Sequence, residues 1–244
     1  MATSNPVLSE KAFQNLRHVG GYGDIMTIDG SVNKVGILLL IVLLTAYFSW
    51  GSVTTGSASL WMGLGGIGGF IVAIVTVFKK EWSPITAPVY AGLEGLFLGA
   101  FSAYMESIYG GIVFEAISLT MLILFGLLFV YKTRIINVTD NFRLGIFAAT
   151  FGIAGIYLLS FILGLFGMPF PYIHDNGLIG IGFSLFVVVI ASMNLILDFD
   201  FIERGADRAL PKYMEWYGAF GLMVTLIWLY IEILRLLAKL RSRE

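Results

Sequence analysis

Residues 35–53 read VGILLLIVLLTAYFSWGSV and contain no charged side chain. A bilayer core is about 30 Å thick, and a helix needs roughly 20 apolar residues to cross it. The stretch is apolar on every face, whereas a strand of a membrane β-barrel would alternate polar and apolar residues. Six further stretches of this kind cover residues 59–78, 85–105, 111–131, 144–166, 176–197 and 216–237. We therefore expect an all-α integral membrane protein, a bundle of seven transmembrane helices.

The composition leaves little room for an aqueous domain. Of the 244 residues, 58% are hydrophobic and 13% are charged, and the mean hydropathy is +0.88. A soluble domain of this size cannot cover itself with so few charges. We expect one transmembrane domain over residues 35–244, preceded by a polar N-terminal arm over residues 1–34 in which residues 20–33 form a loop or a disordered segment. The arm lacks the pattern of a cleaved secretory signal, so the first span should be retained.

Residue usage argues against several functional classes. The 15 basic and 16 acidic residues provide no strongly basic face for nucleic acid, and the absence of cysteine excludes disulfides and thiolate sites. His18 and His174 lie far apart and are expected in loops rather than as metal ligands. Nucleotide-binding and metalloprotease motifs are missing, and Ser184 has no histidine in a later span to act as its base. We expect no enzyme and no cofactor other than a permeant or bound cation.

Lysine and arginine lie in the N-terminal arm and in every second connection between spans. These residues are Lys11, Arg17, Lys34, Lys79, Lys80, Lys132, Arg134, Arg143, Arg204, Arg208 and Lys212. The bias predicts a cytoplasmic N-terminus by the positive-inside rule. Lys239, Arg241 and Arg243 disagree, because after seven spans the C-terminal tail would lie outside. A re-entrant last segment would remove this conflict and is kept as an alternative.

Small residues and prolines mark particular helix contacts. Gly65 with Gly69, and Gly95 with Gly99, form Gly-x-x-x-Gly motifs that predict close approach of two helices. The alternative is that glycine is simply common in membrane helices. Pro84 and Pro88 stand at the start of the third span and are expected to shape its entry.

Glu94 is the acid that lies deepest within a span. It follows the start of the third span by about nine residues, hence by about 14 Å at 1.5 Å per residue. A carboxylate at that depth needs a partner, a proton or water. We expect Glu94 to line an ion route; in the alternative, its carboxyl is protonated or hydrogen-bonded and only packs between helices.

Several acids gather around the connection between the sixth and seventh spans, among them Asp198, Asp200, Glu203 and Glu215. Asp198 and Glu215 could meet across this connection and share a proton or hold a cation, which would make a pH-sensitive latch. In the alternative, Asp200, Glu203 and Glu215 pair with the nearby basic residues Arg204, Arg208 and Lys212.

Three more acids, Glu106, Glu115 and Glu232, are expected near the opposite surface. They could form the outer mouth of a ladder of acids that continues through Glu94 to Asp198 and suits a cation or proton path. The alternative for Glu232 is a local ion pair with Arg235, three residues further along the helix.

One stretch resembles a known family. Residues 193–203 read MNLILDFDFIE and are followed by a charged loop and a last span, and residues 88–99 read PVYAGLEGLFLG. These segments resemble the transmembrane Bax inhibitor motif family, and most of all its bacterial YccA-type branch. The resemblance implies seven helices with the last one central, a location in the bacterial plasma membrane and a pH-dependent calcium leak.

The resemblance also implies a pair of aspartates that governs opening, one at the end of the sixth span and one in the seventh. Asp198 matches the first. The second has no counterpart, because residues 216–222 read WYGAFGL. Asp200 and Glu215 are the candidate substitutes.

We therefore expect a pH-sensitive calcium or cation leak channel in the lipid bilayer. Asp198, Asp200 and Glu215 would form its pH gate, Glu94 would line the route, and calcium would bind at Asp198 and Glu94, since hard cations prefer oxygen ligands. The second hypothesis, also implied by the resemblance, is a regulatory protein that binds a membrane protease or another membrane complex through its arm and modulates stress survival without conducting ions. A third, a proton-coupled transporter, lacks support because no inverted repeat is evident.

Overall fold

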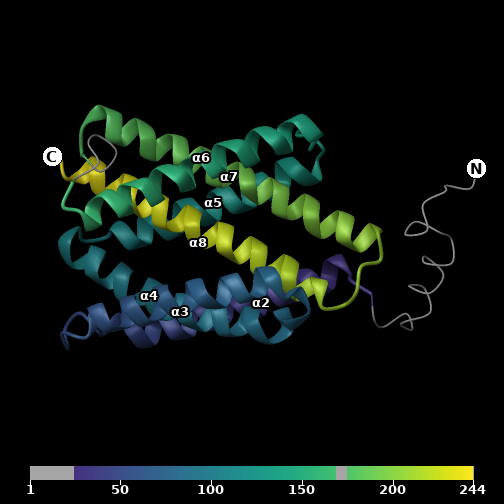
Figure 1. Ribbon diagram of the computed structural model, residues 1–244, viewed down its shortest axis with the longest axis horizontal. Coiled ribbons are helices and arrows are strands. Elements are labelled where there is room, and N and C mark those ends of the chain that lie inside the picture. The colour runs from purple at the N-terminus through teal and green to yellow at the C-terminus, as the bar shows by residue number, and fades with distance from the viewer. Residues whose placement is uncertain (1–24, 169–174, 244) are drawn as a thin grey trace, which may run out of the picture.

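The computed structural model describes residues 25–168 and 175–243, and these form a bundle of long helices (Figure 1). The helices are α2 (Ile28–Trp50), α3 (Ala58–Phe78), the short 3₁₀ helix η2 (Lys80–Trp82), α4 (Ser83–Ile108), α5 (Ile112–Lys132), α6 (Asp140–Leu165), α7 (Leu178–Asp207) and α8 (Met214–Arg241). Seven helices in this part of the chain are long and apolar enough to cross a membrane. The expected all-α membrane fold is confirmed, and the one β-bridge in the described residues joins Ile25 to Pro211.

Several helices extend beyond the apolar windows. α2 begins at Ile28 rather than near residue 35, because the Thr27 side chain caps it by accepting a hydrogen bond from the Gly30 amide. Residues 28–33 are therefore helical, which corrects the loop expected there, while residues 1–24 of the arm lie outside the described residues. α7 likewise continues through its charged residues to Asp207.

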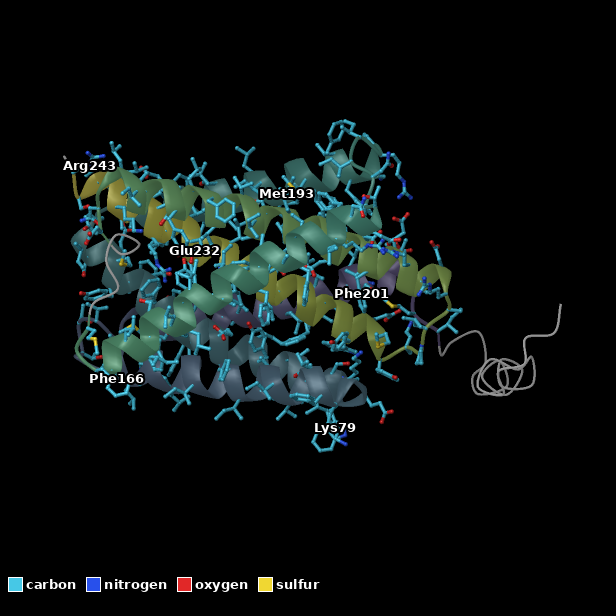
Figure 2. All side chains as sticks on the ribbon, turned by 45° about the horizontal axis from the view of Figure 1, so that its top comes forward. Lys79, Phe166, Met193, Phe201, Glu232 and Arg243 are labelled. Carbon is cyan, nitrogen blue, oxygen red and sulfur yellow. The ribbon has the colours of Figure 1, made fainter. Side chains whose placement is uncertain are left out.

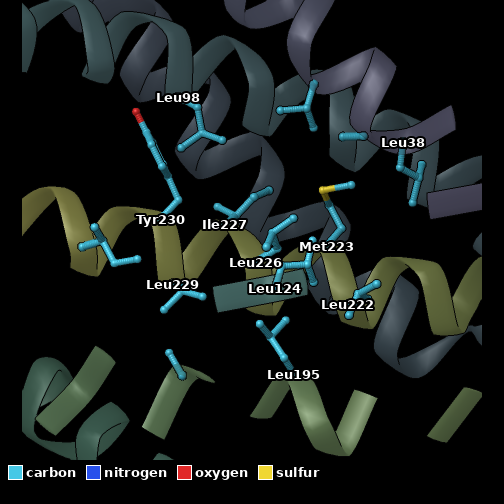
Figure 3. Close-up of a cluster of buried hydrophobic side chains, with 14 of the residues drawn as sticks. Leu38, Leu98, Leu124, Leu195, Leu222, Met223, Leu226, Ile227, Leu229 and Tyr230 are labelled. Atoms are coloured by element: carbon cyan, nitrogen blue, oxygen red, sulfur yellow. The ribbon is translucent and has the colours of Figure 1, made fainter. Parts of the chain in front are cut away.

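α8 is the central helix. In Figure 1 it runs diagonally, with α2, α3 and α4 on one side and α5, α6 and α7 on the other, and it contacts α2, α4, α5 and α7. In its most apolar window 61% of the residues are buried, against 11% for α6. Figure 3 shows Leu222, Leu226 and Leu229 of α8 packing in the core with Leu195 of α7. The expectation that the last helix is surrounded by the others is confirmed.

The two glycine motifs lie where α4 touches its neighbours. A Cβ built on Gly65 of α3 would lie 2.5 Å from the Leu93 carbonyl oxygen. A Cβ on Gly95 of α4 would lie 2.5 Å from the Val42 carbonyl oxygen of α2, and one on Gly99 would overlap backbone atoms of Ala46. Such contacts are shorter than packed atoms allow, so glycine lets these backbones approach. The predicted close contacts are present.

The two ends of the bundle differ in their charges. We call the end with Lys79, Lys80, Arg134, Arg143 and Lys212 the basic end. The other end, here the opposite end, carries the α4–α5 connection and the C-terminal tail, and Figure 2 shows Lys79 and Arg243 at opposite extremes of the molecule.

The last helix crosses the whole bundle. α8 is continuous to Arg241, whose guanidinium donates to the Gly110 carbonyl and to Glu115, both at 2.6 Å. These contacts place the C-terminal end of α8 beside the α4–α5 connection, so the alternative of a re-entrant last segment is wrong. Arg241 pairs with Glu115, so the basic tail that disagreed with the positive-inside rule is partly neutralised by an acid of the same end.

Candidate functional site

Asp198 lies on α7 where this helix packs against α8. A Cβ built on Gly221 of α8 would lie 3.7 Å from the Asp198 Oδ1 atom, so the missing side chain of Gly221 leaves room for the carboxyl. The hydroxyl of Thr225, one turn further along α8, lies beside the same carboxyl. The Oδ2 atom of Asp198 is buried and has no hydrogen-bond partner in the described residues. Within residues 25–168 and 175–243, Asp198 forms no ion pair.

The Asp198 carboxyl has little around it that could balance a negative charge. A buried carboxylate without a cation is costly, so it needs a proton, a water molecule or an ion. The Thr225 hydroxyl has one hydrogen, which it donates to the Gly221 carbonyl oxygen at 3.3 Å. A protonated Asp198 can donate to the Thr225 oxygen and leave this bond intact, whereas an ionised Asp198 competes with Gly221 for the same hydrogen. Gain or loss of one proton therefore changes the hydrogen bonding between the two helices.

Asp200 and Glu203, next to Asp198 on α7, are both engaged by arginine. Asp200 accepts from Arg143 of α6 at 3.1 Å and from the Nε atom of Arg204 at 2.9 Å. Glu203 accepts from Arg134 and from the Tyr131 hydroxyl. The hydrogen bond to Glu203 raises the pKa of the Arg134 guanidinium above its ordinary value. Both acids thus serve as ion-pair partners, as the alternative reading expected, although Glu203 pairs with Arg134 instead of Arg204 or Arg208.

Glu215 fastens the start of α8 to the start of α2. Its side chain has no exposed surface and accepts from the Thr27 amide at 3.0 Å and the Thr27 hydroxyl at 2.8 Å. The Nζ atoms of Lys212 and Lys34 lie 2.8 and 3.4 Å from its carboxylate oxygens. A Cβ on Gly30 would overlap the Glu215 carboxyl, so the close approach of α2 requires glycine there.

The expected latch between Asp198 and Glu215 is not observed. Asp198 faces Gly221, and Glu215 precedes Gly221 by six residues (221 − 215), or about 9 Å along the helix axis. Glu215 faces α2 instead, with its own lysine partners. The groups beside Asp198 on α8 are therefore a glycine and a threonine.

Glu94 lies on α4, and its carboxyl is directed toward Gly69 of α3. A Cβ built on Gly69 of α3 would lie 2.6 Å from the Glu94 Oε1 atom. No hydrogen bond or ion pair of Glu94 is found among the described residues. Glu94 and Asp198 thus belong to different helix interfaces. No group of three or more His, Asp or Glu side chains that could hold a metal ion occurs in the described part of the chain.

The acids expected at an outer mouth lie at the opposite end and have partners. Glu106 accepts from the amides of Gly111 at 2.5 Å and Val113 at 3.0 Å, and so caps the start of α5. Glu115 pairs with Arg241. Glu232 is buried and accepts from the Tyr157 hydroxyl at 2.8 Å and from Arg235 at 2.9 Å, while its Oε2 atom has no hydrogen-bond partner in the described residues. The local Glu232–Arg235 ion pair is present.

A buried lysine beside Ser184 was missed from the sequence. Lys239 of α8 donates to the Gly180 carbonyl oxygen at 3.0 Å and to the Ser184 hydroxyl oxygen at 2.9 Å. The basic partner of Ser184 is thus a lysine and not a histidine. Helical spacing gave a signal, since Glu232, Arg235 and Lys239 share a face of α8. The contacts satisfy the ammonium group of a lysine that is otherwise enclosed by α7 and α8.

The family comparison agrees with the sequence resemblance. A family model described as "Bax inhibitor 1 like" matches residues 5–242, which include all of the helices above. No curated protein matches the chain.

Proposed function

Because the chain belongs to the Bax inhibitor 1 like family, whose model matches residues 5–242, we propose that it is a pH-sensitive calcium or cation leak channel. Asp198 is the group whose protonation controls the leak. The observation that supports this choice is the buried, unpartnered Oδ2 atom of Asp198 at the interface between α7 and the central helix α8. Asp200 and Glu215 are not assigned to the gate, because basic side chains already hold them.

The proposed mechanism follows from the cost of burying a charge. While Asp198 is protonated, the carboxyl is neutral, and α7 and α8 pack closely around Gly221. Loss of the proton leaves a negative charge without a counterion, which favours separation of the helices and entry of a cation. Carboxylate and carbonyl oxygens are the ligands that calcium prefers. The leak should therefore increase as the pH rises.

We further propose that the basic end faces the cytoplasm of a bacterial plasma membrane. The support is the concentration of lysine and arginine at that end, as the positive-inside rule requires. Glu94 is proposed as a second carboxylate that lowers the barrier for a cation without setting the pH response, because it lies at the α3–α4 interface.

The first prediction concerns the Asp198→Asn variant in liposomes that contain a calcium-sensitive dye. An asparagine resembles the protonated carboxyl in shape but cannot ionise, so the flux should stay low and should not change between mildly acidic and mildly alkaline pH. The matched control is Asp207→Asn, an exposed acid on the same helix, which should keep the pH response.

Glu94→Gln should reduce the flux and preserve its pH dependence.

Two outcomes would contradict the proposal. If the wild-type protein passes no more calcium than protein-free liposomes at any pH, the channel is rejected, and the regulatory role without conduction becomes the better hypothesis. If Asp198→Asn and Asp207→Asn respond to pH alike, Asp198 is not the gate.

A further inference from the structure

A cavity of about 410 Å³ lies between α6 and α7 at the basic end. Three arginines contribute to its lining: Arg143, Arg204 and Arg208. Four large apolar side chains lie beside them: Phe147, Leu197, Phe201 and Leu210. The cavity has no part in the gate proposed above, since Asp198 does not line it.

The charges of the cavity do not balance. Asp200 is its one acidic lining residue, and it is shared by Arg143 and Arg204. Arg208 has no ion pair or side-chain hydrogen bond with any residue in 25–168 or 175–243. Three guanidinium groups against one carboxylate leave a surplus of two positive charges (3 − 1). Asp140 also approaches Arg143, at 3.4 Å, but its side chain is 100% exposed and screened by solvent.

One donor in the cavity wall has no acceptor. The Nε atom of Arg143 is buried and lacks a hydrogen-bond partner among the described residues. A buried guanidinium donor without an acceptor is costly. The guanidinium of Arg143 thus has hydrogen-bonding capacity that its bonds to Asp200 do not use.

Phe147 and Phe201 each lie about one helical turn deeper than the nearest arginine of the same helix, whereas Leu210 lies beyond Arg208 in the α7–α8 connection. Phe147 follows Arg143 by four residues on α6, and Phe201 precedes Arg204 and Arg208 on α7, so the change from charged to apolar lining occurs over about 6 Å. Both rings are exposed, Phe147 at 66% and Phe201 at 39%. Figure 2 shows Phe201 in the same half of the molecule as Lys79. The lining thus passes from cationic to apolar toward the centre of the membrane.

We propose that this cavity binds an anionic phospholipid. Its phosphate lies among the guanidinium groups of Arg143, Arg204 and Arg208, and an acyl chain lies along Phe147 and Phe201. Arginine forks match phosphate oxygens in geometry as well as charge, and basic pockets between transmembrane helices suit such headgroups. The surplus positive charge selects a lipid with a net negative headgroup over a zwitterionic one.

The test uses the full-length protein, purified in detergent and stripped of lipid. Phosphatidylglycerol and phosphatidylcholine with the same acyl chains are added, and native mass spectrometry measures the bound fraction. Arg208→Gln removes the arginine without a protein partner, and Lys79→Gln removes an exposed charge at the same end, away from the cavity. Wild type should prefer phosphatidylglycerol. Arg208→Gln should weaken its binding about fivefold, as one basic residue near an anionic lipid does, and Lys79→Gln should not.

A second variant tests the apolar half of the site. Phe147→Ala alters an exposed ring, so the variant should fold, and it should weaken the binding of both lipids. Glycerophosphoglycerol, which has the headgroup but no acyl chains, should not displace the bound lipid at equal concentration.

The proposal is overturned by equal binding of the two lipids, or by equal losses in Arg208→Gln and Lys79→Gln, which would indicate only a diffuse surface charge. Displacement by glycerophosphoglycerol as effective as by the intact lipid would also overturn it, because an acyl chain would then have no role.

Discussion

Glu215 and Asp198 show how residues of similar chemistry acquire different roles from their surroundings. Glu215 is fully buried but has Thr27, Lys34 and Lys212 around it, so its charge is matched within the protein. Asp198 is held against Gly221 and has no ion pair among the described residues. A matched carboxylate stabilises a helix contact, whereas an unmatched one is poised to gain or lose a proton.

Glu215→Ala should destabilise the protein by about 2 kcal/mol, because it leaves the Thr27 amide and two lysines without their acceptor. The measurement is the unfolding midpoint in detergent under increasing denaturant. Glu81→Ala, an exposed acid at the same end, should change the free energy of unfolding by less than about 0.5 kcal/mol. Equal stability of the two variants would show that the Glu215 contacts do not hold α2 to α8.

Among the helices, the packing of α4 against α2 and α3 depends on glycines, which have no side chain at the points of contact. Gly95 and Gly99 lie against the backbone of α2, and Gly65 of α3 lies against the backbone of α4, each at a distance that a Cβ would not allow, while Gly69 of α3 leaves room for the Glu94 carboxyl. Without a hydrophobic drive between helices in lipid, association depends on close packing of this kind. α6 is the contrasting case, with 11% of its window buried and a cavity between it and α7.

Two glycine-to-alanine substitutions should differ in their effect on stability. Gly99→Ala should destabilise by about 1 to 3 kcal/mol, because the added methyl group overlaps the backbone of α2. Gly126→Ala on α5, where nothing lies within 4 Å of the built Cβ, should be neutral or stabilising by up to about 1 kcal/mol through helix propensity. Denaturation of both variants in the same detergent tests the contrast, and a similar shift of both midpoints would refute close packing at Gly99.

At the scale of the whole molecule, an odd number of spans places the termini of the helical bundle at opposite ends. α2 starts at the basic end beside Glu215, and α8 finishes beside Gly110 and Glu115. The family match to residues 5–242 extends over this whole arrangement.

The absence of cysteine makes topology directly measurable. Single variants Thr54→Cys and Ser242→Cys at the opposite end should react with a membrane-impermeant maleimide in intact cells. Lys79→Cys and Asn137→Cys at the basic end should react only after the membrane is permeabilised. If Ser242→Cys instead reacted under the same conditions as Lys79→Cys, the continuous crossing of α8 would be wrong. If all four variants showed the reverse pattern of labelling, the proposed orientation would be wrong.

Much of the architecture was predictable from local patterns. Long apolar stretches predicted seven helices, the glycine spacing predicted close contacts, and a spacing of three residues predicted the pair Glu232–Arg235. These features are local because a span in lipid must satisfy its own backbone, and helical spacing alone brings such side chains together.

The surroundings of the acids were decided only when the helices packed. The rotation of α8 about its axis places Gly221 and Thr225, and not Glu215, beside Asp198. The position of α4 along α3 places Glu94 beside Gly69. The packing of α8 against α7 brings Lys239 to Ser184. Each of these contacts joins residues far apart in the chain, and it depends on the relative rotation and sliding of whole helices. Apolar length determines that a helix crosses the membrane but carries no information on which way its few polar side chains face, and that choice belongs to the packed bundle.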